Sequence, residues 1–175
     1  MLLKNKVVIV SGIGPGLGQE LSTLAAKEGA KAVVLAARTA AKLDVAEQEI
    51  NALGLGTAVL KVVTDISDQA QCQALADRAV AEFGRIDVLF NSAYDPGSFE
   101  PIESASMDGW RRAMDVNFFG TMYLTQACVV HMKKNGGGAI VMIATMVEHK
   151  PLATQAGYGA SKSALRCATK HLALE

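Results

Sequence analysis

The pattern that most constrains the fold is a regular alternation of short apolar runs with helix-like segments. The runs are apolar on both faces, as expected for strands of a parallel sheet that helices cover on both sides. They lie at Val7–Val10, Val33–Ala37, Ala58–Val63, Ile86–Phe90 and Ala139–Ile143. Helices are predicted at Gly18–Glu28, Ala40–Leu53, Asp68–Phe83, Asp108–Lys134 and Gly157–Leu174. This order predicts an α/β protein with a doubly wound parallel sheet in three αβα layers.

The composition narrows the class of partner. The chain has 175 residues, half of them hydrophobic, and Lys+Arg and Asp+Glu both number 17. A globular fold with a sizeable core is therefore expected, and neither a nucleic acid nor a membrane is expected as a partner. Cys72, Cys128 and Cys167 show no CxxC spacing, so reduced thiols and a cytoplasmic location are expected. The longest apolar stretch, Gly138–Val147, is too short to span a bilayer.

Glycines are concentrated between the first predicted strand and the first predicted helix. Gly12, Gly16 and Gly18 suit a tight turn, close backbone approach to phosphate and close helix–sheet packing, and Gly14 and Leu17 lie in the same loop. The free N–H groups of the following helix favour an anionic ligand. The position after the first strand favours binding of a dinucleotide pyrophosphate, although glycines that only form a turn remain the alternative.

The end of the second predicted strand bears on which dinucleotide is bound. An NAD site usually has a carboxylate about 20 residues after the glycine loop, whereas here the sequence reads Leu35–Thr39 with Arg38 and no acid. A guanidinium suits a 2′-phosphate, and each charge-assisted hydrogen bond contributes about 1.5–3 kcal/mol. Arg38 therefore favours NADP(H), with NAD as the alternative if Arg38 stacks on adenine or faces solvent.

Tyr158 and Lys162 are a candidate acid/base pair. Their i, i+4 spacing places both side chains on one face of the last predicted helix. An ammonium about 4 Å away favours a phenolate by up to about 4 kcal/mol at an effective dielectric constant of 20. Such a phenol can exchange a proton with a carbonyl or alcohol oxygen. Taken alone, however, the same pair is common on solvated helix surfaces.

Taken together, these motifs resemble the short-chain dehydrogenase/reductase family, from about residue 6 to the end of the chain. The loop Ser11–Gly18 is similar to the family's Thr-Gly-x-x-x-Gly-x-Gly. Further similar segments are Asp65-Ile66, Asn91-Ser92-Ala93, Asn117 and the Tyr158/Lys162 pair.

The resemblance implies a Rossmann-like domain over residues 1–175 and a role for each of these residues. Tyr158 is expected to be the general acid/base, Lys162 to tune the phenol and bind the nicotinamide ribose, and Asn117 to support a proton relay. Asp65 and Ile66 are expected to hold the adenine. Cofactor contacts are also expected from Asn91 and Ala93.

The sequence departs from the family pattern at two positions. Thr145 stands where the family usually has the substrate-orienting serine, and it keeps a hydroxyl donor while adding a methyl group. Tyr94 replaces a glycine and is expected either to pack beside the nicotinamide pocket or to fill space under the following loop.

The chain also ends at Glu175, inside the helix that carries Tyr158, whereas family members continue. The resemblance therefore implies that a C-terminal part is missing and that these residues belong to a longer protein.

The resulting functional prediction is hydride transfer between a nicotinamide cofactor and a secondary alcohol or ketone, without a metal. A small-molecule carbonyl or alcohol substrate and a homodimer or homotetramer are expected from the resemblance. The alternatives are a non-catalytic dinucleotide-binding regulatory protein and a related dehydratase or epimerase.

Overall fold

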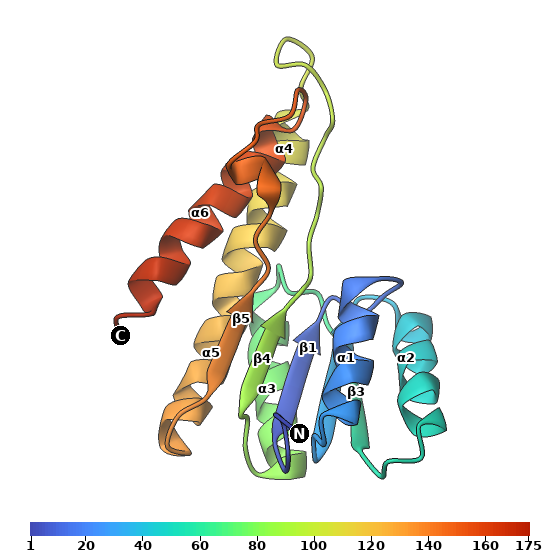
Figure 1. Ribbon diagram of the computed structural model, residues 1–175. Coiled ribbons are helices and arrows are strands. Elements are labelled where there is room, and N and C mark those ends of the chain that lie inside the picture. Colours follow the sequence, from blue (N-terminus) through green and yellow to red (C-terminus); the bar gives the residue numbers. More distant parts are fainter.

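The computed structural model describes residues 1–175 and contains a five-stranded parallel sheet with helices on both faces (Figure 1). The strands are β1 (Val7–Ser11), β2 (Ala32–Ala37), β3 (Ala58–Val63), β4 (Val88–Asn91) and β5 (Ala139–Met142). They lie in the order β3-β2-β1-β4-β5, and all neighbours are parallel. The predicted Rossmann-like αβα fold class is confirmed.

The helices follow the strands as the alternation predicts. They are α1 (Leu17–Lys27), α2 (Ala40–Ala52), α3 (Gln69–Phe83), α4 (Met107–Met114), α5 (Thr121–Lys134) and α6 (Ala156–Leu172). In Figure 1, α1 and α2 cover the front of the sheet while α3 and α5 lie behind it. None of the helices is both long and apolar enough to cross a membrane.

Two apolar cores hold the three layers together. On one face, Val8 and Val10 of β1 pack with residues of α1 and α2, including Leu43 and Ile50. On the other face, alternate strand residues such as Ile9 pack with α3 and α5. The residues of β1 and β2 are buried on both faces apart from Ala37, which is partly buried. By contrast, the edge strands β3 and β5 are partly exposed, and Val141 of β5 is 38% exposed.

Residues at its two ends determine where helix α3 begins and where it stops. The carboxylate of Asp68 accepts the N–H groups of Ala70 and Gln71, so Asp68 is the N-cap of α3, and Ser67 lies outside the helix. Gly84 ends α3 with a φ of 80°, a left-handed conformation that glycine adopts without steric cost.

The helix predicted over Asp108–Lys134 is interrupted, which corrects that prediction. Residues Asp115–Gly120 form a π-helical turn, η1, between α4 and α5. A Cβ on Gly120 would lie 2.8 Å from the carbonyl oxygen of Ile66, so the helix approaches the loop after β3 very closely here. Such π turns occur mostly within α-helices and frequently at functional sites. This one contains Asn117.

Candidate active site

The turn from β1 to α1 is shaped by two close backbone contacts. A Cβ on Gly12, whose φ is 81°, would overlap the backbone of Ala93, and a Cβ on Gly18 would overlap the carbonyl oxygen of Gly12. Gly16 is the N-cap of α1 with a φ of 111°, and no side chain caps the first turn. The first N–H groups of α1 are therefore free of side-chain capping bonds and are suited to an anionic ligand.

A crevice of about 330 Å³ lies along this turn, at the carboxyl ends of the strands. It occupies the point where the strand order reverses around β1, which is where open α/β sheets bind their ligands. The predicted cofactor residues that line it are Gly12, Gly14, Leu17, Gly18, Arg38, Asp65, Ile66 and Ala93. Gly16 does not line it. Asn91 does not line it either, because its buried side-chain amide donates to Thr125 Oγ1 and Met142 Sδ instead.

Two positively charged side chains, those of Arg38 and Lys42, line this crevice. Arg38 follows β2, and Lys42 lies one turn further on in α2, with its side chain 3.4 Å from the position of a Cβ on Gly14. Both side chains line the crevice, both residues are exposed, and neither forms an ion pair. The sequence analysis missed Lys42, although its i, i+4 spacing from Arg38 at the start of a helix was a usable signal.

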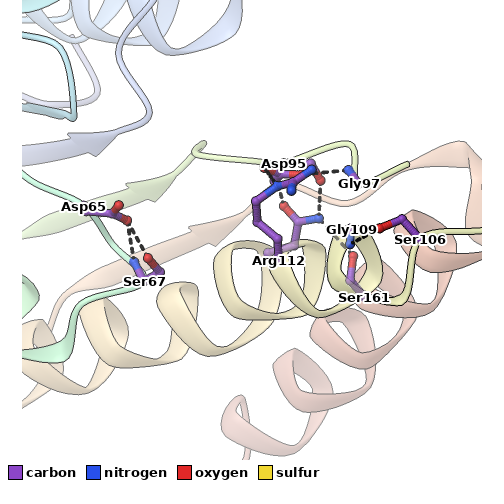
Figure 2. Close-up of polar contacts among 9 residues, drawn as sticks. Asp65, Ser67, Asp95, Gly97, Ser106, Gly109, Arg112 and Ser161 are labelled. Carbon is purple, nitrogen blue, oxygen red and sulfur yellow. Dashed lines mark hydrogen bonds and ion pairs between the residues drawn. The ribbon is translucent and has the colours of Figure 1, made fainter. Parts of the chain in front are cut away.

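Asp65 is held in a tight loop at the end of β3. One oxygen of its carboxylate accepts both the N–H and the hydroxyl of Ser67 (Figure 2). The N–H of Asp65 donates to Gln71 Oε1. Asp65 and Ile66 both line the crevice, together with residues of the glycine turn.

Asn117 connects three separate segments. Its Oδ1 accepts the N–H of Asp95 at 2.8 Å, while its Nδ2 donates to the Asp95 carbonyl and to Ser161 Oγ at 2.8 and 2.9 Å. The Asp95 carboxylate in turn accepts Gly97 N–H and Arg112 Nε, as Figure 2 shows. The loop after β4 is thus fixed against η1 and α6.

Tyr158 and Lys162 lie one turn apart on α6, as predicted. Lys162 is 3% exposed, and its Nζ donates to the Ile143 carbonyl at 2.9 Å. Burial lowers the pKa of the Lys162 ammonium to about 8, and the negative charge of Glu148 opposes this shift. The side chain therefore remains mostly cationic at neutral pH. Tyr158 is partly buried.

Thr145 lies between β5 and the short 3-10 turn η2 (Met146–Glu148). Its hydroxyl oxygen accepts the N–H of Val147 at 3.4 Å, so the hydroxyl proton is still available for a substrate oxygen. Ile143, which accepts the bond from Lys162, lies two residues before Thr145.

The crevice and the Tyr158/Lys162 pair are joined through one side chain. Val116 lines the crevice, Asn117 follows it, and the amide of Asn117 bonds to Ser161, the neighbour of Lys162. Neither Tyr158 nor Lys162 itself lines the crevice. No group of three or more His, Cys, Asp or Glu side chains is arranged to hold a metal ion.

The parallel sheet with helices on both faces and the glycine-lined crevice at its switch point define a Rossmann-like α/β protein. The sequence model of short chain dehydrogenases matches residues 6–175. The chain belongs to this family, a family of oxidoreductases.

Similar proteins that are described as oxidoreductases or dehydrogenases agree with this assignment. An uncharacterized oxidoreductase of Methylorubrum extorquens is 36% identical, with 99% of this chain and 68% of the relative covered. The 7alpha-hydroxysteroid dehydrogenase of Escherichia coli is 32% identical over 99% of this chain and 66% of its own length.

The fold agrees with solved structures of the family. A structure of NAD+-bound xylitol dehydrogenase matches with a TM-score of 0.93 and 30% identity, covering 98% of this chain and 65% of the other. The chain therefore spans about two thirds of the length of these relatives.

Proposed function

We propose that this chain carries the cofactor site and the acid/base group of an NADP(H)-dependent enzyme that interconverts a secondary alcohol and a ketone. The observation that supports the proposal is that Tyr158 lies one helical turn before the buried Lys162, on a helix bonded through Ser161 to Asn117, the residue next to the crevice wall. A phenol beside an ammonium is suited to exchange a proton with a carbonyl or alcohol oxygen.

The residues of the crevice fit a dinucleotide. The backbone contacts at Gly12 and Gly18 leave no room for side chains, and the uncapped first turn of α1 offers N–H groups to a pyrophosphate. Asp65 and Ile66 would hold the adenine. Arg38 and Lys42 supply two positive charges without ion-pair partners, which favours a 2′-phosphate and hence NADP(H) over NAD.

The bound nicotinamide supplies the hydride, and the chain supplies orientation and the proton. In the reduction, the Tyr158 hydroxyl gives its proton to the substrate oxygen. In the oxidation, the Tyr158 phenolate removes the proton of the substrate hydroxyl. Thr145 donates a hydrogen bond to the same oxygen. The ammonium of Lys162 stabilises the phenolate, and Asn117 holds α6 in place against the loop after β4.

The test is to mix the protein with NADPH and a panel of secondary ketones while following cofactor absorbance and products. Oxidation of NADPH coupled to alcohol formation is expected. Binding of NADPH without turnover of any ketone would favour a regulatory protein. Conversion of substrate with no net oxidation of NADPH would favour a dehydratase or epimerase.

A further inference from the structure

A buried carboxylate lies next to the proposed catalytic residues and has no part in the mechanism above. The side chain of Glu148, in η2, is 2% exposed. Its Oε1 accepts the backbone N–H of Thr145 at 3.1 Å, which with the Thr145 hydroxyl forms a reciprocal capping box. Its Oε2 accepts no hydrogen bond. A buried carboxylate oxygen without a donor is costly, so an electrostatic partner is expected nearby.

That partner is the face of α6 that carries the acid/base pair. Tyr158, Lys162 and Arg166 follow one another at i, i+4 spacing and therefore share one face of the helix. Arg166 Nε lies 3.6 Å from Glu148 Oε2, one turn beyond Lys162. Glu148 thus places one negative charge against a helix face that bears two positive charges.

Further titratable groups lie on α6 and on the elements packed against it. They are Asp108, Arg111, Arg112, Asp115, His149, Cys167, Lys170 and His171. Of all the charged groups around α6, Glu148 is the one whose negative charge opposes the effect of burial on the pKa of Lys162.

We propose that Glu148 is a positioning residue of the active site, with two tasks. Its Oε1 holds the backbone at Thr145, which keeps the hydroxyl of that residue in place. Its negative charge, buried against the α6 face one turn beyond Lys162, favours the protonated form of the Lys162 side chain. The second task matters for catalysis only if the proposed function is right, because only then does the Lys162 charge act on Tyr158.

Glu148→Gln separates the two tasks. The glutamine keeps an oxygen that can accept the Thr145 N–H and removes only the charge. The direct readout is the titration of Lys162, followed through its 13Cε chemical shift and assigned by the loss of the signal in Lys162→Gln. Glu103→Gln, which neutralises an exposed carboxylate on the loop before α4, is the matched control.

The pKa of Lys162 is expected to fall by about one unit in Glu148→Gln, the lower end of the effect of a close opposite charge, and to stay unchanged in Glu103→Gln. An unchanged Lys162 titration in Glu148→Gln would overturn the proposal. Should Glu148→Gln fail to fold, Arg166→Gln is measured instead. Removing this competing cation is expected to raise the pKa of Lys162, and a fall or no change would contradict the arrangement proposed here.

A kinetic readout links the proposal to the reaction. The alkaline limb of kcat for NADPH-dependent reduction should move to lower pH in Glu148→Gln by the same amount as the Lys162 titration, and an unmoved limb contradicts the charge role. If the wild type turns over no ketone at all, the proposed function fails. The titration then still decides the role of Glu148.

Discussion

The side-chain amide of Asn117 lies 2.9 Å from the hydroxyl of Ser161, the residue directly before Lys162. The same amide binds both backbone groups of Asp95, so one buried side chain connects the loop after β4 to the helix that carries the proposed acid/base pair. The π turn at Asp115–Gly120 contains Asn117, and the relative position of crevice and acid/base pair therefore depends on this turn.

Asn117→Ala should cost about 2–6 kcal/mol of unfolding free energy. The substitution leaves the N–H and the carbonyl of Asp95 without the amide, whereas Ser161 keeps its bond to the Tyr158 carbonyl, and each of the two unsatisfied groups costs about 1–3 kcal/mol. Urea unfolding followed by circular dichroism measures the loss. Asn135→Ala, at an exposed asparagine after α5, should change the free energy by less than about 0.5 kcal/mol. Equal stability of the two variants would contradict the role of Asn117.

Arg38→Ala and Lys42→Ala should each weaken NADPH binding more than NADH binding. If each cation makes one charge-assisted contact worth about 1.5–3 kcal/mol, each loss corresponds to about 10- to 150-fold in Kd for NADPH. Fluorescence titration with both cofactors measures the ratio. Lys31→Ala, at an exposed lysine before β2, is the control. An unchanged preference in Arg38→Ala would overturn the assignment to NADP(H).

Thr145→Ser should retain turnover, whereas Thr145→Ala should lower kcat at least about tenfold. Serine keeps the hydroxyl that donates to the substrate oxygen, and alanine removes it. Steady-state kinetics on a ketone that the wild type reduces make the comparison. Undiminished turnover in both variants would remove Thr145 from the mechanism.

Stability should depend on pH through Lys162. Its pKa is about 8 in the folded protein and 10.5 without burial, so between these values the unfolded chain binds more protons. The contribution of Lys162 to the unfolding free energy should therefore be unfavourable and constant below about pH 8, and should improve as pH rises towards 10.5. The wild type should gain stability relative to Lys162→Met between pH 7.5 and about 10. A flat difference would contradict the burial of a charged lysine.

Much of the fold could be predicted because its signals are local. The apolar runs predict the first and last residues of the five strands to within two positions, and Gly84 predicts where α3 ends. Eight predicted cofactor residues line one crevice because the carboxyl ends of parallel strands meet at one edge of the sheet.

Features that depend on contacts between distant segments could not be predicted. The π turn lies where Gly120 closely approaches Ile66, and a helical pattern of apolar residues does not predict such a turn. The orientation of Asn91 towards Thr125 and the burial of Glu148 beside α6 likewise depend on packing between elements.

The most direct test of the central claim is the turnover of Tyr158→Phe with NADPH and a ketone that the wild type reduces, measured beside the Kd for NADPH. The substitution removes one hydroxyl and keeps the ring, so the Kd should change by less than about threefold while kcat falls by at least about 10³-fold, as for loss of a general acid. Turnover within tenfold of the wild type would show that the proton does not come from Tyr158, and the account would fail.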